Sequence, residues 1–566
     1  MAELLLGRPD SGSITRQSDY IEQSGSWGFF LQDDWKVSRK LTLNLGLRYE
    51  FETPLHERFD RSTLGFETAY VQPISAAAQA KYATIYPTIT GGFPELPPSA
   101  FSLKGGMTFA GQNGNGGSLY NTPKNVFMPR IGIAYQLDSK TVLRSGMGMF
   151  AGFLGERRGD VIQQGFTQNT NMTVSNDNGL TWAATMANPF PNGVAEAVGA
   201  AAGLQTYLGQ GLSYFNQNPK IPLTTRWEAS LQRQVGQVLL QFDYIGNKTN
   251  HIELTRNINT LPAQYLSTLK TRDDVYNNYL TATFANPMVG LVPGNSQGIY
   301  TGTTTNRQTM LSPYVAFSSN AINTTENTGY AWYHSFQFTA SKRFAKGCTV
   351  QGSYTFQKWQ QAVNLLNASD LRPIEEISDA DAPHRINISS VWALPFGKGR
   401  HYLNSTNGFV SRLVGGWEVS GIWSLQSGFP LAFGNSIYYG DPANILLPLN
   451  QRTAEHWFNV ANFETNTARQ LLGNQVRTFP LRFAQIRGPR QNNVDIAVIK
   501  QTRITEGKNL EFRAEALNFA NHPFFPNPNM TVTAAQSAQD TGFGQISAST
   551  MSNYARRFQM SLRFLF

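Results

Sequence analysis

Cysteine is nearly absent from this chain, which holds one, Cys348, among 566 residues. A single cysteine cannot form an internal disulfide, so a disulfide scaffold, a cysteine-based metal site and a redox pair are all excluded. Long apolar runs are absent as well: no stretch of about 18 apolar residues occurs, and the mean hydropathy is −0.31. Transmembrane helices are therefore excluded. A transmembrane β-barrel is not, because each of its strands carries only about five lipid-facing residues among polar ones.

Charge is sparse and unclustered. Charged residues make up 15% of the chain, and 46 Lys and Arg residues against 37 Asp and Glu residues give a net charge of +9. The basic residues are scattered over turns and alternating strand positions instead of forming a stripe, which argues against nucleic acid as a partner. The excess fits solvated loops, which we favour, or cationic side chains beside anionic lipid head groups.

Strict alternation of apolar and polar residues is the strongest signal that is present. The chain ends in RFQMSLRFLF, and the apolar face of this strand consists of Phe558, Met560, Leu562, Phe564 and Phe566. Such a strand shows one face to lipid and the other to water, and many outer-membrane barrels end in an aromatic residue. We expect these five residues to be the C-terminal assembly signal, with the barrel-assembly machinery and outer-membrane lipid as partners.

The same alternation recurs upstream and predicts about thirteen strands, most of them near the roughly nine to eleven residues that cross a bilayer at a tilt. The alternating runs that mark these strands lie at 25–35, 41–51, 131–137, 141–150, 227–231, 240–244, 336–340, 350–356, 386–394, 417–425, 494–498, 510–516 and 557–566. Aromatic residues near strand ends are expected to form a girdle at the lipid boundary, namely Trp35, Trp227, Tyr244, Trp332, Tyr333 and Trp359.

Short turns and long connections alternate between the predicted strands without exception. The long ones, rich in Asn, Gly, Pro, Thr and Gln, lie at about 52–127, 151–224, 252–332, 359–384, 426–491 and 519–556. A soluble sandwich would spread its loop lengths more evenly. The pattern therefore predicts an all-β fold, a transmembrane antiparallel up-and-down β-barrel with short periplasmic turns and long extracellular loops, in the bacterial outer membrane.

Four strings carry a family resemblance: FFLQDDWKVSRKLTLNLGLRYEF, HRINISSVWALPFGKGR, GGWEVSGIWSLQSGFPL and NLEFRAEALNFANHPFFPNPN. Together with the Phe-terminated last strand, they resemble the barrel of Oar-like TonB-dependent transporters, which carry an N-terminal carboxypeptidase-regulatory-like domain. The resemblance implies a 22-stranded barrel, a plug in its lumen, and energy supplied through TonB. It implies energy-coupled uptake into the periplasm of a large or scarce ligand, such as a carbohydrate, a peptide or a metal chelate, bound by extracellular loops.

The start of the sequence departs from that pattern. No signal peptide, regulatory-like domain or plug precedes the first predicted strand, and thirteen strands are too few and of the wrong parity for closure. We therefore expect the C-terminal part of a 22-stranded barrel. Residues 1–24 would be a truncated N-terminal segment or loop, and residues 25–566 a partial barrel that meets the TonB complex only through a missing plug region.

Candidate functional residues fall into two groups. In the long loops, residues with rings or hydrogen-bonding side chains could bind a ligand, although packing of the loops against one another explains them better: Asn113, Asn115, Tyr120, Trp182, Tyr207, Tyr214, Tyr438, Tyr439 and Trp457. Alternation predicts that a set of charged residues faces the lumen, either seating the plug or forming a solvated wall: Glu511, Arg513, Glu515, Arg557 and Arg563.

Enzymatic and metal-dependent functions have little support. The string DADAPHR brings Asp379, Asp381 and His384 close together, but two carboxylates and one imidazole in a loop fit turn chemistry better than a metal site. No catalytic residues, metal ligands or cofactor are expected. Two alternatives to a transporter stay open: a passive porin or structural barrel without a plug, and a soluble secreted β-rich binding protein.

Overall fold

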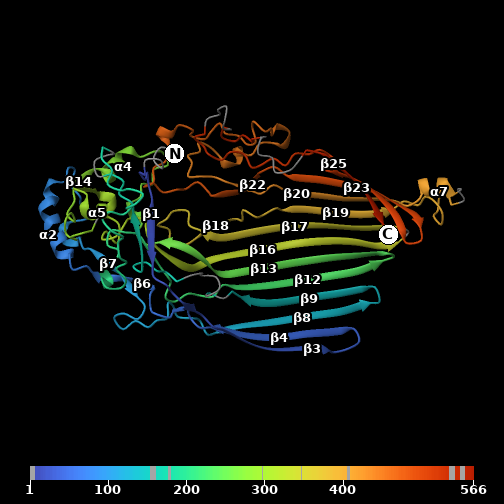
Figure 1. Cartoon of the computed structure of the whole chain (residues 1–566), viewed down its shortest axis with the longest axis horizontal. Coiled ribbons are helices and arrows are strands. Elements are labelled where there is room, and N and C mark those ends of the chain that lie inside the picture. Colours follow the sequence, from blue (N-terminus) through green and yellow to red (C-terminus); the bar gives the residue numbers. More distant parts are fainter. Residues whose placement is uncertain are drawn as a thin grey trace.

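One large antiparallel sheet dominates the computed structural model (Figure 1). The structure describes residues 7–152, 154, 161–175, 180–295, 297–345, 347–404, 408–534, 542–547 and 555–566. The sheet runs in chain order through β3 (Ser26–Lys36), β4 (Leu41–Glu52), β8 (Val126–Asp138), β9 (Thr141–Ala151), β12 (Leu223–Val235), β13 (Val238–Asn257), β16 (Ile322–Ala345), β17 (Cys348–Asn364), β19 (His384–Ala393), β20 (Trp417–Gln426), β23 (Gln491–Thr505), β24 (Lys508–Leu517) and β25 (Arg557–Leu565). These are the thirteen predicted strands, so the predicted fold class is confirmed.

Three central strands are longer than predicted: β13 has 20 residues, β16 has 24 and β17 has 17. Two short strands join the sheet beside them, β11 (Leu212–Tyr214) parallel to β16 and β18 (Ile374–Ile377) antiparallel to β17. The wall therefore extends into the long connections at its centre. These strands are longer than the roughly nine to eleven residues that cross a bilayer, so their loop ends extend beyond the membrane.

The sheet is open within the described part of the chain, where β3 and β25 each have one neighbour. All pairings along the path are antiparallel, so an odd number of strands leaves the two edge strands running in the same direction. Both edge strands are exposed over nearly their whole length. An unpaired edge in hydrocarbon is costly, because its N–H and C=O groups have no water to bind.

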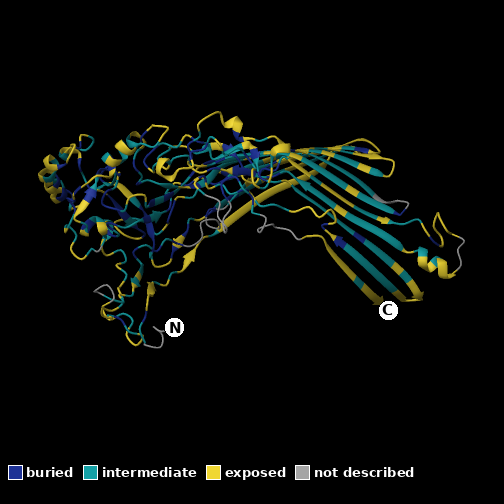
Figure 2. Cartoon of the chain, turned by 90° about the horizontal axis from the view of Figure 1, so that it is seen from above, coloured by how far each residue is buried: buried dark blue, intermediate teal, exposed yellow. Residues whose placement is uncertain are grey.

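Alternation divides the wall into an apolar and a polar face. On β16 and β17, Phe336 pairs with Phe356 on one face, while Ser335 pairs with Gln357 on the other. Figure 2 shows the result as bands of different exposure along the strands. No helix among the described residues is long and apolar enough to cross a membrane.

Connections are short at one end of the sheet and long at the other, with one departure from the predicted alternation. The β19–β20 connection lies at the short-turn end but covers residues 394–416, and it contains helix α7 (Gly408–Val414). It is as long as the β17–β19 connection at the opposite end, residues 365–383. The prediction of short turns without exception is therefore wrong at this place, where residues 394–404 and 408–416 form a small lobe.

The long connections fold into a cap with its own secondary structure, at the left and upper centre of Figure 1. Its strands are β1 (Ser13–Gln17), β2 (Glu22–Gln23), β5 (His56–Glu57), β6 (Thr63–Val71), β7 (Lys104–Phe109), β10 (Thr167–Asn171), β14 (Thr283–Ala285), β15 (Thr304–Asn306), β21 (Pro430–Ala432) and β22 (Arg482–Arg487). Its helices are α2 (Ser75–Ile85), α4 (Asp274–Thr281), α5 (Gly298–Thr301) and α6 (Arg307–Met310), with 3-10 turns at Tyr86–Thr88, Pro98–Ala100, Gly203–Gln205, Ala263–Tyr265, Pro442–Ile445, Leu449–Gln451 and Thr467–Arg469.

Most buried apolar side chains lie in this cap (Figure 2), and only a few, such as Ala497 of β23 and Ala516 of β24, lie in the wall. Those in the cap form three clusters. The first joins the β4–β8, β9–β12 and β13–β16 connections around Phe93, Met107 and Tyr300. The second lies around Tyr120, and the third joins the β20–β23 and β24–β25 connections around Phe433. The loops therefore have hydrophobic cores of their own and do not depend on lipid for burial.

Candidate ligand-binding surface at the loop end

The polar face of the wall carries a hydrogen-bonded ladder that crosses several strands. Arg144 of β9 donates from Nη1 to Oε1 of Gln232 at 2.8 Å, and Gln232 donates to Oε1 of Gln241 at 2.9 Å. Gln241 of β13 then donates to both carboxylate oxygens of Asp243 at 2.9 Å. One face of the wall thus carries amides and charges, and the other carries rings and aliphatic side chains. A wall between lipid and a water-filled lumen requires this division.

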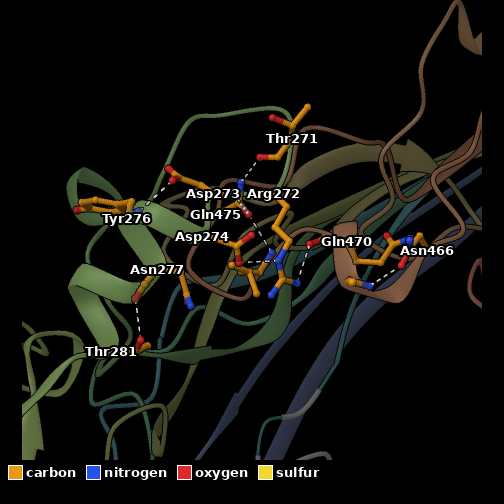
Figure 3. A network of polar contacts seen from close by, with 12 residues as sticks. Thr271, Arg272, Asp273, Asp274, Tyr276, Asn277, Thr281, Asn466, Gln470 and Gln475 are labelled. Carbon is orange, nitrogen blue, oxygen red and sulfur yellow. Dashed lines mark hydrogen bonds and ion pairs between the residues drawn. The ribbon is translucent and has the colours of Figure 1, made fainter.

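Loops from distant parts of the sequence are tied together within the cap (Figure 3). Gln475, from the β20–β23 connection, accepts a hydrogen bond from the Asp273 backbone N–H at 3.2 Å and donates to the Thr271 carbonyl at 2.8 Å. The Asp273 carboxylate in turn caps helix α4 by accepting from the Tyr276 N–H at 3.0 Å. Because the two contacts of Gln475 join segments about 200 residues apart, the cap is cross-linked and not a set of independent loops.

Two buried ion pairs hold the β20–β23 connection against the β17–β19 connection. Arg482 Nη1 lies 2.8 Å from Glu376 Oε2, and Arg487 Nη2 lies 2.7 Å from Asp381 Oδ2. Both carboxylates are almost fully buried. A buried carboxylate needs a cation and further donors, and Asp381 also accepts from the Trp359 backbone N–H at 2.7 Å. This clasp fixes the loops at the edge of the polar face.

Beneath the clasp lies a cavity of about 380 Å³ between the polar face and the loops. Its wall residues are Asn247, Tyr333, Gln357, Trp359, Arg385 and Gln426, and its loop residues are Ala380, Ala382 and Phe429. The Tyr333 hydroxyl donates to Gln357 Oε1 at 2.9 Å, and the rings of Tyr333 and Trp359 meet edge to face at 6.1 Å. Arg385 donates from Nε to Gln426 Oε1 at 3.0 Å. Rings, amides and a cation in one concavity suit a ligand that bears hydroxyl or carboxylate groups.

A family model described as an outer membrane beta barrel domain matches residues 1–559 of this chain. The chain belongs to that family. Its apolar face is accordingly the face toward lipid, and the place of the chain is the outer membrane. Outer-membrane barrels have long extracellular loops and short periplasmic turns. In that arrangement, the long, capped connections of this outer-membrane barrel are its extracellular loops, and its short turns face the periplasm.

No curated protein matches the sequence significantly. Solved structures that it resembles include the ferripyoverdine receptor of the outer membrane of Pseudomonas aeruginosa, with 10% identity over 97% of this chain and 39% of the receptor, at a TM-score of 0.38. The ferric-catecholate import receptor Fiu from K12 E. coli shows 10% identity over 96% of this chain and 45% of that one, at 0.37. The copper transporter OprC shows 9% identity over 96% and 49%, at 0.37. The chain spans about two fifths to one half of the length of these structures.

The barrel's predicted ligand-binding residues do not converge on one place. Five of them pack inside the cap: Tyr120 in the second cluster, Tyr207 and Tyr214 beside the first, and Tyr438 and Trp457 beside the third. Burial raises the pKa of Tyr214 to about 12, so its hydroxyl stays protonated. For these five, the packing role that the sequence favours is the one that the structure describes.

The other four predicted ligand-binding residues are more accessible. Asn113 is exposed in a turn at a positive φ of 53°, and Asn115 donates to the Phe109 carbonyl at 3.2 Å. Trp182 is exposed, as is Tyr439, whose hydroxyl donates to Glu464 Oε2 at 2.9 Å. None of the four lines the cavity beneath the clasp. They remain predictions for ligand contact.

The predicted lumen-facing charges lie on the last two strands of the barrel. Glu511 pairs in register with Arg563 across β24 and β25, and it accepts from Gln501 Nε2 at 3.3 Å. Arg513 forms an ion pair with Glu515 along β24, with 2.5 Å between Nη2 and Oε1. Arg557 pairs in register with Leu517 at the loop end of β25. The register thus brings opposite charges together, as alternation predicts, and their facing a lumen remains a prediction.

On the opposite face of β25, the predicted assembly residues form an exposed apolar stripe: Phe558, Met560, Leu562, Phe564 and Phe566. The cluster DADAPHR is explained by the clasp, since Asp381 pairs with Arg487 while the His384 ring contacts Tyr354. Among the described residues, no group of His, Cys, Asp or Glu is arranged to hold a metal ion.

The cavity residues include two that sequence patterning assigned to the wrong face. Tyr333 and Trp359 were expected in the lipid-boundary girdle, but they share the parity of Ser335 and Gln357 and line the polar cavity. Trp332, next to Tyr333, does lie on the apolar face, where it stacks on Tyr330. Adjacent residues of a strand face opposite sides of the sheet. The odd positions of Tyr333 and Trp359, shared with Ser335 and Gln357, were therefore the sequence signal that both rings lie on the polar face.

Proposed function

We propose that this chain is the wall and loop cap of a TonB-dependent transporter of the outer membrane, of the Oar-like type. Residues 25–566 form the C-terminal barrel portion, residues 1–24 lead into it, and a plug region completes it. The transporter binds a large or scarce ligand in its extracellular loops and passes it to the periplasm with energy supplied through TonB.

One observation carries the proposal: a cavity with aromatic, amide and cationic walls lies where a cross-linked loop cap meets the polar face. A passive porin gains nothing from a cap of several buried clusters, whereas a receptor must hold its binding groups in place before the ligand arrives. The quoted sequence strings support the Oar-like type.

In this scheme, Trp359 and Tyr333 provide ring faces, while Arg385 and Gln426 orient polar groups of the ligand. The exposed loop residues Asn113, Trp182 and Tyr439 make the first contacts outside. The charged set on β24 and β25 (Glu511, Arg513, Glu515, Arg557 and Arg563) lines the lumen and seats the plug. No chemical step on the ligand is involved, and no cofactor takes part.

The test is uptake by cells with and without the gene. Cells receive maltoheptaose, a tryptic digest of casein or a ferric tris-catecholate, and depletion from the medium is followed by mass spectrometry. We expect depletion of one probe class to require the gene and to stop when TonB is deleted. Depletion that needs the gene but survives TonB deletion would establish the passive channel instead, and constitutive conductance in a planar bilayer would agree with it.

Variants then locate the site. Trp359→Ala and Arg385→Gln should each reduce uptake of that probe at least tenfold at limiting concentration, because ring contact and charged hydrogen bonds are lost. The matched control is Trp392→Ala, which removes the same ring from the apolar face of β19. Equal losses in Trp359→Ala and Trp392→Ala would show that the effect comes from the wall and not from the cavity.

A further inference from the structure

The lobe in the β19–β20 connection lies outside the proposed ligand-binding region. Its helix α7 lies beyond the periplasmic turns, at the right in Figure 1, and is far from the loop cap. Two large apolar side chains on it point into open space: Phe409 is 79% exposed and Leu413 is 60% exposed. They are four residues apart and therefore share one face of the helix. Large apolar side chains together on a short surface helix call for an apolar surrounding.

The lobe is held against the apolar face of the wall. Trp417 Nε1 donates to the Leu413 carbonyl at 2.9 Å. Lys500 Nζ donates to the carbonyls of Arg412, Leu413 and Gly415 at 2.8, 2.9 and 2.8 Å, which satisfies the C-terminal end of α7 and complements its dipole. The Lys500 ammonium also lies 4.8 Å from the centre of the Trp417 ring. The helix end is therefore fixed by three charged hydrogen bonds and one indole.

The strand register shows which face of the sheet carries Trp417 and Lys500. Lys500 pairs with Trp417 on one side and with Phe512 on the other, and Phe512 pairs with Leu562 of the exposed apolar stripe. Residues directly opposite one another in a sheet lie on the same face. Trp417 and Lys500 thus belong to the lipid-facing side of the outer-membrane barrel, and α7 is anchored at the periplasmic rim of that side.

Beside the helix lies a basic cleft of about 600 Å³. Its cationic side chains are Lys398, Arg400, Arg412 and Arg503, and its one acid is Glu506, which lies 3.8 Å from Arg503. In the part of the chain that the structure describes, the side chains of Lys398, Arg400 and Arg412 form no ion pair. Three unpaired cations around one concavity suit a phosphate-bearing ligand.

Gly416 and one hydrogen bond to Ser411 fix the lobe on the wall and join the cleft to α7. Gly416 has a φ of +74°, and a Cβ there would lie 2.1 Å from the carbonyl oxygen of Gln501. The Gln501 N–H donates to the Gly416 carbonyl at 2.9 Å, which seats the lobe on β23. On the other side, the Lys398 N–H donates to Ser411 Oγ at 3.3 Å and joins the cleft to α7. The cations and the apolar helix face are therefore presented together.

We propose that this lobe binds an anionic phospholipid of the periplasmic leaflet of the outer membrane. Phe409 and Leu413 enter the acyl region, while Lys398, Arg400 and Arg412 hold the phosphate and the charged head group. The arrangement has the two parts that interfacial anchoring requires, an apolar helix face and basic residues at head-group depth. The occupant is a membrane lipid and not free phosphate, because Arg412 of the cleft precedes the exposed Leu413 on α7, and that helix is anchored by Trp417 and Lys500 at the lipid-facing rim.

The first experiment measures lipid retention on the whole gene product, extracted from outer membranes in mild detergent. The protein is incubated with phosphatidylglycerol or phosphatidylcholine of identical acyl chains, and bound lipid is counted by native mass spectrometry. We expect several-fold more bound phosphatidylglycerol than phosphatidylcholine, and we expect Lys398→Gln/Arg400→Gln/Arg412→Gln to abolish that difference. Inorganic phosphate at 100-fold excess over lipid should not displace the phosphatidylglycerol.

The matched control is Lys36→Gln/Arg39→Gln/Lys40→Gln, which removes three exposed cations from the β3–β4 turn in the same leaflet. It should keep the preference. Equal loss in both triple variants would overturn the proposal in favour of a general charge effect, and full displacement by phosphate would show a simple anion site. Heat-modifiable migration on gels confirms that every variant is folded.

The second experiment tests the position of the helix. Phe409→Cys in a Cys348→Ser background is labelled with the environment-sensitive dye NBD and reconstituted in vesicles that contain phosphatidylglycerol. We expect blue-shifted emission and quenching by lipids brominated near the head of the acyl chain. Emission typical of water, with no quenching, would overturn insertion of α7. Both readouts are independent of uptake, so a failed transport experiment leaves this proposal untouched, and the reverse also holds.

Discussion

Arg487 binds both the side chain and the backbone of Asp381: one guanidinium nitrogen lies 2.7 Å from the carboxylate, and another donates to the Asp381 carbonyl at 2.7 Å. The Asp381 side chain is 1% exposed. The Arg487 carbonyl also accepts from the Trp457 indole at 2.7 Å. Arg487, the last residue of β22, therefore connects that strand to the β17–β19 connection and to Trp457 beside the third cluster. Removing it should loosen the loop cap above the cavity.

We predict that Arg487→Met destabilises this corner of the cap by about 3–5 kcal/mol, because it leaves a buried carboxylate without its cation. The measurement is the free energy of local opening from amide exchange in residues 374–383 and 427–433. Asp379→Asn is the control, since that side chain is 69% exposed and lies 3.8 Å from Arg482. It should change the opening free energy by about 0.5 kcal/mol or less. Equal effects in both variants would contradict the clasp.

Arg307 is a buried arginine that holds a different part of the cap together without a carboxylate. It donates to the carbonyls of Thr90, Gly92 and Tyr279 at 2.6 to 3.1 Å, and its guanidinium lies 4.2 Å from the centre of the Tyr279 ring. We predict that Arg307→Lys lowers the stability of this region by about 2 kcal/mol, because an ammonium cannot serve all three carbonyls and the ring.

Amide exchange of residues 90–93 and helix α4 measures this loss. The control is Arg272→Lys, because the Arg272 side chain is partly exposed, at 27%, and its ion-pair partner Asp274, 2.7 Å away, is 58% exposed. A lysine can replace that contact, so protection should be unchanged. Unchanged protection in Arg307→Lys as well would show that the buried guanidinium adds nothing beyond its volume.

Glu57 should make the β5 corner of the cap sensitive to acid. Burial alone would raise the pKa of this carboxylate, but backbone N–H donors from Ile21, Arg61 and Phe59 outweigh it and hold the pKa below its usual value. These hydrogen bonds are 2.9, 2.7 and 2.8 Å long. A lowered folded-state pKa stabilises the fold above the unfolded-state pKa, near 4.5, and that contribution is lost as the pH falls through the folded-state pKa.

We therefore predict that protection of residues 56–61 decreases between pH 7 and pH 3, after correction for intrinsic exchange. Glu57→Gln should open more easily at pH 7, by about 1–3 kcal/mol, and should show little further change at low pH. Glu67→Gln, which alters an exposed carboxylate in β6, should behave as the parent protein. An identical pH response in the Glu57→Gln variant would assign the acid sensitivity to another group.

The wall could be predicted from the sequence because its signal is local. A strand such as β24 shows its two faces within ten residues, and each predicted strand needed only its own alternation and a nearby turn. The thirteen strands were found for this reason. Strand ends were less predictable: β16 begins at Ile322, which pairs with Leu212 of β11, and the next residue, Asn323, pairs with Asn257 of β13. Such pairings depend on residues far away in the sequence.

The cap and the cavity could not be predicted in this way. The first cluster joins Phe93, Leu280 and Tyr300 from separate connections, and no periodicity in the sequence marks these residues as neighbours. Composition marks Tyr120 and Tyr438 as loop residues that either contact a ligand or, as favoured, pack; both pack in the cap, but in two different clusters that the sequence does not indicate. Long-range packing decides these positions, so local composition indicates only that something in the loops is ordered.

The last strand allows a test of the assembly signal on two adjacent residues. Phe566 is 94% exposed at the end of the apolar stripe, and Leu565 lies on the opposite face, paired in register with Asn509. We predict that Phe566→Ala reduces the heat-modifiable, membrane-inserted form several-fold, as expected if the aromatic end of the apolar face is the assembly signal. Leu565→Ala removes a similar apolar side chain and should assemble normally. If both variants assemble equally well, or both fail, then strand hydrophobicity governs insertion and Phe566 is not a specific signal; quantitative gel shift of outer-membrane fractions separates these results.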